Sequence, residues 1–224
     1  MKQFQYFIKS FTGILFFIII LFVSAGRLDY YHGWVYTAIS LLGLFLSFVI
    51  TADDKELLEE RSHIFKDAKE WDKRILKLSV LTTIIAYAVA GLDSGRYQWS
   101  PQFHWSIVLM GVVLMFLGQL LFLIAKKTNA FFSSVMRIQH DRGHTVCESG
   151  VYHYVRHPGY AGMILSWAGF PLLIGSLWSI IPIVTAIILL LIRKHLEDRT
   201  LIAELPGYSE YRQKTRFKLI PGIW

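Results

Sequence analysis

The stretch GVYHYVRHPGYAGMI, residues 150–164, places a charged tripeptide directly in front of an apolar run. Proline is favoured in the first turn of a helix, and it restricts the residue before it to extended conformations. We therefore expect His157 to be the last extended residue and Pro158 to open a helix. The free amides of that first turn, at the positive end of the helix dipole, could receive an anionic group. The alternative is that Arg156 and His157 only anchor a helix end at a membrane surface.

A second group of polar residues lies on the segment LLLIRKHLEDRTLIAEL, which ends in an apolar leucine. Arg193, Glu197 and Leu201 are four residues apart, so they share one face of a helix. An ion pair within the helix would use the same spacing, but arginine before glutamate is the poorer order for such a pair. A proline and a glycine then break the helix, and we expect the tyrosines that follow, Tyr208 and Tyr211, to be residues of the interfacial belt.

Paired histidines offer a different chemistry. His140 and His144 are four residues apart, as are His153 and His157, and histidine pairs at helical spacing can bind metal, as in membrane di-iron oxidases. Such a centre needs many ligands near one face, and Pro158 disfavours a regular helix through His157. The sequence therefore favours a site without metal.

The composition indicates a membrane protein. Of the 224 residues, 54% are hydrophobic, 15% are aromatic and only 17% are charged, which is far more apolar than a soluble domain. In so apolar a chain, a net charge of +7 indicates anionic lipid headgroups as the counterpart, and we expect no nucleic-acid partner. The single Cys147 excludes an internal disulfide and fits the reducing side of a membrane. We also expect no cleavable signal peptide, since no small-residue cleavage pattern follows the first apolar run.

Long apolar runs predict where the chain crosses the membrane, because a helix needs about 20 apolar residues to span the hydrocarbon core. The last run, residues 160–192, is too long for one span and a little short for two. Gly175 and Ser176 near its middle predict a tight helical hairpin. The sequence thus predicts an all-α, polytopic integral membrane protein with about six transmembrane helices. The four runs before the hairpin are residues 11–25 (extended back towards residue 4), 33–51, 75–91 and 103–125.

The basic residues predict the orientation of these helices. All Lys and Arg residues except Arg27 and Arg96 fall in the N-terminus, two long loops and the C-terminal tail. The positive-inside rule then places both termini and both loops in the cytoplasm, at the inner membrane if the chain is bacterial. We expect a four-helix membrane region over residues 1–125, with an acidic and basic loop at 52–74. A second region over 126–224 then holds the hairpin, the polar candidates and an amphipathic C-terminal tail.

Two blocks of this second region resemble a known family. HTVCESGVYHYVRHPGYAG, an apolar hairpin and then RKHLEDRTLIAELPGYSEYRQKT are similar to the isoprenylcysteine carboxyl methyltransferases, in a bacterial-type form, and to their relatives the phospholipid N-methyltransferases. The resemblance covers residues 144 to about 216. The loop ELLEERSHIFKDAKEWDKRIL is similar more loosely. The resemblance implies a membrane methyltransferase whose cytoplasm-facing region, 126–224, binds S-adenosylmethionine and meets a prenylated or lipid-like acceptor.

The resemblance also implies roles for single residues. Asp198 matches a second acidic residue that the family shows after the cofactor-binding glutamate, and Cys147 stands where the family often has valine. A polar cofactor contact upstream in the family matches either Arg137 or Gln139. The methyl acceptor would face Arg193, which is the predicted catalytic residue. The implied cofactor contacts are His144, Thr145, Val146, Cys147, Tyr152, His157, Pro158, Tyr160 and Glu197.

These residue types fit the chemistry of methyl transfer. Glu197 can pair with the amine or ribose hydroxyls of the cofactor, His157 and the helix amides can hold its carboxylate, and tyrosines can stack on adenine or face the sulfonium. A carboxylate acceptor is ionised near neutral pH and needs only a cation to orient it, whereas an amine must first lose a proton. We expect Arg193 to be buried without an acidic partner, so that a carboxylate acceptor supplies one.

The sequence therefore favours carboxyl methylation, and several alternatives stay open. The first is N-methylation of a phospholipid amine. The others are a histidine-rich membrane oxidase, a transporter or structural membrane protein, and a relative that reduces sterols with a nicotinamide cofactor.

Overall fold

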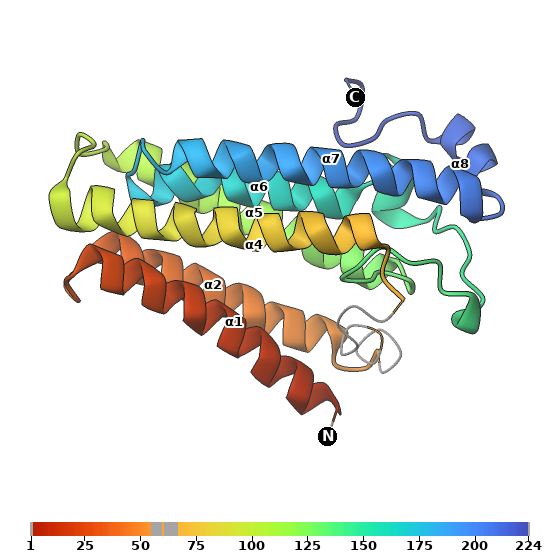
Figure 1. Ribbon diagram of the computed structural model, residues 1–224, viewed down its shortest axis with the longest axis horizontal. Coiled ribbons are helices and arrows are strands. Elements are labelled where there is room, and N and C mark those ends of the chain that lie inside the picture. Colours follow the sequence, from red (N-terminus) through yellow and green to blue (C-terminus); the bar gives the residue numbers. More distant parts are fainter. Residues whose placement is uncertain (1, 55–59, 61–66, 224) are drawn as a thin grey trace.

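A computed structural model describes residues 2–54, 60 and 67–223 of the chain. Residues 55–59 and 61–66 of the predicted loop at 52–74 lie outside these described residues. Within the described part the chain is all-helical, without a β-strand, as the sequence predicts. The long helices run side by side as a bundle (Figure 1). Their bounds are α1 Lys2–Ala25, α2 Tyr31–Thr51, α4 Glu70–Ala90, α5 Trp105–Thr128, α6 Pro158–Ile174, α7 Ile180–Glu204 and α8 Tyr208–Lys214.

Within the described residues, four helices are long and apolar enough to cross a membrane, judged by length and composition: α1, α2, α4 with the π-helical turn Gly91–Tyr97, and α5. The fifth, α6, is apolar but has only 17 residues. The sixth, α7, has 25 residues, and its C-terminal part is charged. These positions match the predicted runs and agree with a polytopic membrane protein. The predicted division at residue 125 stays a prediction.

The predicted hairpin is present, and Pro158 opens it as expected. Pro158 is the first residue of α6, and His157 precedes it as the N-cap with a φ of −128°. Gly175 ends α6 in the left-handed conformation, with a φ of 72°, and α7 begins five residues later. The buried carboxylate of Asp93 accepts a hydrogen bond of 2.6 Å from the Ser176 hydroxyl, so the π-helical turn after α4 is bonded to the tip of the hairpin.

Helices α5 and α6 pack more closely than their side chains would otherwise permit, because glycines face each other across the contact. A Cβ atom on Gly118 would lie 2.5 Å from the carbonyl oxygen of Gly162, and one on Gly162 would lie 2.6 Å from the carbonyl oxygen of Gly118. Small residues of this kind let helix backbones approach in a membrane, where apolar burial alone gives little driving force between helices. This packing fixes the start of α6 beside the end of α5.

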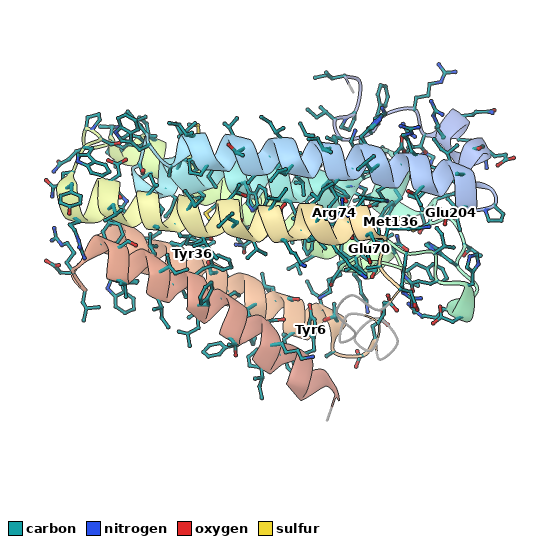
Figure 2. All side chains as sticks on the ribbon, viewed as in Figure 1. Tyr6, Tyr36, Glu70, Arg74, Met136 and Glu204 are labelled. Carbon is teal, nitrogen blue, oxygen red and sulfur yellow. The ribbon has the colours of Figure 1, made fainter. Side chains whose placement is uncertain are left out.

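The long segment between α5 and α6 and the C-terminal tail lie at one end of the bundle, and both termini lie toward this end (Figure 1). The connections from α1 to α2, from α4 to α5 and from α6 to α7 lie at the other end. Glu70, Met136 and Glu204 lie at the end with the C-terminal tail, whereas Tyr36 lies farther along the helices (Figure 2). A small apolar core holds the end together: Met136, Ile138, Leu205, Tyr208 and Tyr211 are all buried. It sits apart from the main core of α1, α2, α4, α5, α6 and α7, which includes Leu21, Tyr36, Ala86, Phe170 and Leu173.

The close packing of α5 and α6 leads to a test. Gly162→Leu inserts a side chain where the backbones meet, and overpacking of a well-packed contact costs about 1–3 kcal/mol. We expect a lower melting temperature in detergent, measured by circular dichroism. Gly13→Leu in α1 is the matched control, because a Cβ atom there meets nothing within 4 Å. Equal melting temperatures for the two variants would contradict the close contact.

Candidate active site

One pocket of about 280 Å³ opens at the end of the bundle where the segment between α5 and α6 and the C-terminal tail lie. This volume is near the lower end of small-molecule pockets, about 300–1,000 Å³. Its wall combines residues 129–137, residues 144–147 and the facing parts of α6, α7 and α8. Of the predicted site residues, Pro158 is buried in the first turn of α6 and is not part of the wall. The others all line the pocket: His144, Thr145, Val146, Cys147, Tyr152, His157, Tyr160, Arg193 and Glu197.

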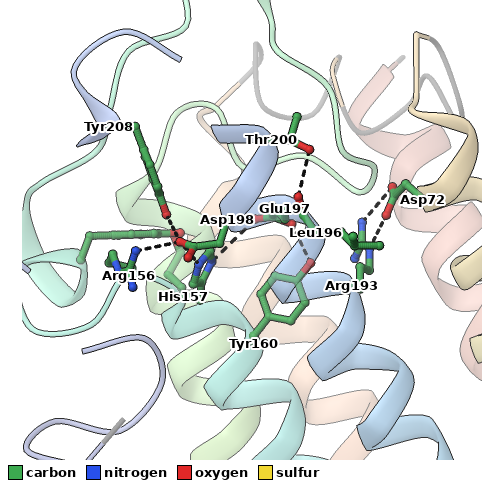
Figure 3. A network of polar contacts seen from close by, with 12 residues as sticks. Asp72, Arg156, His157, Tyr160, Arg193, Leu196, Glu197, Asp198, Thr200 and Tyr208 are labelled. Atoms are coloured by element: carbon green, nitrogen blue, oxygen red, sulfur yellow. Dashed lines mark hydrogen bonds and ion pairs between the residues drawn. The ribbon is translucent and has the colours of Figure 1, made fainter. Parts of the chain in front are cut away.

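The carboxylate of Asp198 joins the two blocks of sequence that carry these residues. It is 5% exposed and accepts hydrogen bonds from Nη1 of Arg156 at 2.8 Å and from the Tyr208 hydroxyl at 2.8 Å. Nε2 of His157 lies 3.2 Å from the same oxygen (Figure 3). A buried carboxylate needs such partners, because an unpaired buried charge is strongly unfavourable. Asp198 therefore holds the tripeptide at the start of α6 against α7 and α8.

Glu197, the next residue, points into the pocket instead. Its Oε2 accepts a hydrogen bond of 2.6 Å from the Tyr160 hydroxyl, and its Oε1 lies 3.8 Å from Nδ1 of His157. The side chain is 22% exposed, in contrast to the 8% of the Asp198 side chain. The two neighbouring acids thus differ in role: Asp198 is buried and pairs with protein groups, and Glu197 is a carboxylate that a ligand can reach.

Arg193 lies one turn earlier on α7, and its guanidinium is 5.8 Å from the centre of the Tyr160 ring. The expectation that this arginine lacks an acidic partner is wrong. Its Nε donates to Oδ1 of Asp72 at 2.6 Å, and its Nη2 donates to Oδ2 at 3.2 Å (Figure 3). Asp72 lies 121 positions away on α4 and is fully buried. Sequence reasoning missed it because it stands in a charged stretch at the start of α4, without a local signal.

His144 forms part of an aromatic wall. Its ring stacks on Phe131 with ring centres 4.6 Å apart, and its Nδ1 accepts a hydrogen bond of 3.3 Å from the backbone N–H of Gln139. Burial, together with the positive charges of Arg137 and Arg142, lowers the pKa of His144 to about 4. The imidazole is therefore neutral near pH 7, and it offers the pocket a flat, uncharged ring.

The two upstream candidates, Arg137 and Gln139, differ in the structure. Arg137 lines the pocket, but its guanidinium is held by Glu60, with Nε donating at 2.9 Å. Gln139 is fully buried and donates from Nε2 to the carbonyl of Phe131 at 2.8 Å. Gln139 thus holds the turn that carries the stacked rings, and only Arg137 borders the pocket.

The C-terminal tail contributes Tyr208 and Tyr211 to the lining of the pocket. Tyr208 and Tyr211 are 4% and 1% exposed, so the expectation that they belong to an interfacial belt is wrong. The Tyr211 hydroxyl donates to the carbonyl of Tyr152 at 2.6 Å. Beyond α8, the backbone N–H groups of Arg156 and His157 donate to the carbonyls of residues 217 and 218. The tail is thus a structural part of the site.

The histidine pairs do not form a regular helix. His140 begins a short 3-10 turn that ends at Arg142, and His153 ends another that begins at Gly150. Among the residues that the structure describes, no group of three or more His, Cys, Asp or Glu side chains is placed to hold a metal ion.

Comparisons with known proteins show that part of the chain is similar to one protein family. The model of the isoprenylcysteine carboxyl methyltransferase (ICMT) family matches residues 107–203. Two curated proteins from Oryza sativa, one from subsp. indica and one from subsp. japonica, are each named "Probable protein-S-isoprenylcysteine O-methyltransferase". Each is 33% identical over 66 residues, which is 29% of this chain but only 34% of the relative's length. The comparisons thus confirm, over residues 107–203, the similarity to the isoprenylcysteine carboxyl methyltransferase family that the sequence motifs indicate.

Proposed function

We propose that the chain is an integral membrane methyltransferase that uses S-adenosylmethionine to methylate the carboxylate of a prenylated or other lipid-like acid. One observation carries this proposal. Residues from two separate blocks of sequence, 144–160 and 193–197, line a single pocket that combines a reachable carboxylate, an arginine and aromatic rings. The family match over residues 107–203 supports the same activity.

The residues of the pocket fit the parts of the cofactor. The Glu197 carboxylate suits an ammonium group or ribose hydroxyls, and the neutral ring of His144 on Phe131 suits a flat base. The start of α6 supplies backbone amides at the positive end of the helix dipole, beside His157, for a carboxylate. The buried Tyr152 and the half-buried Tyr160 add aromatic faces. We propose that these residues, with residues 145–147, hold the cofactor.

The pocket also has apolar lining residues that suit a hydrophobic acceptor. Leu76 of α4, Phe122 of α5 and Met163 of α6 line it, and all three stand on apolar helices. Arg193 lines the same pocket, so we propose that an acid whose chain rests on these side chains brings its carboxylate to the guanidinium. Both termini lie at the pocket end of the bundle, and the positive-inside rule supports placing this end in the cytoplasm (Figure 1).

Catalysis in this arrangement is mainly positioning. When bound, the cofactor supplies an electrophilic methyl group: its S–CH3 bond breaks as a carboxylate oxygen forms the O–CH3 bond, sulfur keeps the electron pair, and no proton is released. Arg193 orients the acceptor carboxylate. This carboxylate is already ionised near neutral pH, so no general base is needed to remove a proton from it. Tyr160 and His157 keep Glu197 in place. Holding two reactants in line can supply much of the rate enhancement of such a displacement.

N-methylation of a phospholipid amine is the second candidate, and the ion pair between Asp72 and Arg193 favours it. Because Asp72 neutralises Arg193, the pocket repels an amine less than a lone arginine would. Assays with both acceptor classes separate the two candidates.

The first prediction concerns the cofactor. The purified protein in detergent should bind S-adenosylmethionine or its demethylated product, measured by calorimetry, because the pocket offers partners for each polar part of the molecule. Folded protein that binds neither compound would rule out the methyltransferase proposal. A stoichiometric bound metal would favour the histidine-rich oxidase instead.

Glu197→Gln should weaken cofactor binding, because it removes the one carboxylate among the described lining residues that a ligand can pair with. Losing a hydrogen bond to a charged group costs about 1.5–3 kcal/mol, which is on the order of tenfold to a hundredfold in affinity. Glu204→Gln is the matched control, since Glu204 stands on the same helix and pairs with Lys69 at the surface. Parental affinity in Glu197→Gln would place Glu197 outside the cofactor site.

Arg193→Ala and Arg193→Lys should leave cofactor affinity nearly unchanged and reduce methyl transfer, on the order of a hundredfold for misplaced reactants. Lysine has one nitrogen, which cannot serve both Asp72 and an acceptor in the geometry of a planar guanidinium. Transfer rates should be compared for N-acetyl-S-farnesylcysteine and for phosphatidylethanolamine, with the exposed Arg199→Ala as control. Full activity in Arg193→Ala, or activity on the amine alone, would overturn the carboxyl-methyl assignment.

A further inference from the structure

Asp72 lies in the first turn of α4, outside residues 107–203, and nothing in its own segment indicates a part in the site. It is fully buried, and it is not part of the pocket wall, where Arg193 is. A carboxylate placed behind a pocket residue can act only through that residue. Its effect on chemistry therefore depends on how it holds the guanidinium of Arg193.

The contacts of Arg193 divide its nitrogens into two sets. Nε donates to Asp72, and Nη2 donates both to Asp72 and, at 3.0 Å, to the backbone carbonyl of Ser134. Asp72 is itself fixed by a hydrogen bond of 2.6 Å from the backbone N–H of Met136. Within the part of the chain that the structure describes, Nη1 donates no hydrogen bond. The forked edge of the guanidinium is thus occupied by the protein, and a single nitrogen remains for a ligand.

This division matters for a carboxylate that must accept a methyl group. A free arginine fork binds both oxygens of a carboxylate, and each N–H then occupies a lone pair that could otherwise attack. A single nitrogen holds one oxygen and leaves the other free to form the new O–CH3 bond. Asp72 therefore occupies Nε and Nη2 of Arg193, the pair of nitrogens that could otherwise bind both oxygens of the acceptor and make them less reactive.

We propose that Asp72 is a positioning residue: it holds the Nε and Nη2 edge of Arg193 so that Nη1 alone receives one oxygen of the acceptor carboxylate. This role rests on the proposed carboxyl methylation. The site would then need α4 as well as the C-terminal region, because Asp72 of α4 orients Arg193.

The test is Asp72→Asn, which keeps the shape of the side chain and removes its charge. We expect cofactor affinity, measured by calorimetry, to stay within about twofold of the parent, and kcat for N-acetyl-S-farnesylcysteine to fall about tenfold to a hundredfold. We expect the affinity for this acceptor, measured by calorimetry with the demethylated cofactor present, to stay equal or become tighter, because the fork is freed. A merely structural role would instead weaken both affinities.

Two further variants separate orientation from folding. Asp72→Asn combined with Arg193→Ala should be no slower than Arg193→Ala alone, because residues that act as a unit are not additive. If Asp72→Asn fails to fold, Asp72→Glu keeps the charge pair and shifts the fork, and it should lower kcat while it binds the cofactor as the parent does. Glu70→Gln is the matched control, since Glu70 stands on the same turn of α4 and is exposed.

The outcomes distinguish this role from the proposed function. No methyl transfer by the parent chain to any carboxylate would overturn the proposed function and the role of Asp72 together. Parental kcat in Asp72→Asn or in Asp72→Glu, while Arg193→Ala is slow, would overturn the role of Asp72 alone. A parallel loss of cofactor and acceptor affinity in a folded Asp72→Asn protein would also overturn it.

Discussion

The site depends on one buried carboxylate. Asp198 accepts contacts from Arg156, His157 and Tyr208, which come from the start of α6 and from α8. Without this carboxylate, a buried arginine and the histidine that caps α6 would lose their common partner. Removing one partner of a buried ion pair destabilises a protein strongly, because the other charge is left buried and unpaired. The constraint explains why the charged tripeptide can stand at the beginning of an apolar helix: the buried Asp198 carboxylate pairs with the positive charge of Arg156.

A chain of polar contacts joins α4, α7 and α6. Asp72 pairs with Arg193, whose guanidinium lies beside the Tyr160 ring, and Tyr160 donates to Glu197. Of these polar groups, the Glu197 carboxylate and Nη1 of Arg193 are left for ligands by the described residues. A site built in this way is rigid, because each group that faces the pocket is held by one that does not. The acidic partners that orient the site are therefore as important as the residues that line it.

Much of the fold could be predicted from the sequence, because it is written in local patterns. The apolar runs predicted the long helices, Gly175 predicted the turn of the hairpin, and Pro158 predicted the first residue of α6. The same holds for the spacing of Arg193 and Glu197, which do share one face. The role of Asp198 in the centre of the site could not be predicted, since two of its three partners, Arg156 and His157, are 42 and 41 positions away.

The remaining misses have the same physical cause. Asp72 is indistinguishable in sequence from its charged neighbours, and only packing of α4 against α7 brings it to Arg193. Tyr211 resembles an interfacial tyrosine until the tail folds back and buries it. The contact of Gly118 with Gly162 likewise depends on how two helices meet. Local chemistry is visible in one sequence, whereas the partners that orient it are set by tertiary structure.

The central claim is that the acceptor atom is a carboxylate oxygen. The most direct measurement is the stability to base of the product that forms when the purified protein, in a bilayer with N-acetyl-S-farnesylcysteine and phosphatidylethanolamine, receives methyl-labelled S-adenosylmethionine. A methyl ester releases the label as volatile methanol in mild alkali, and this is the result that the site predicts. A label that stays bound to nitrogen and does not become volatile in alkali would contradict it.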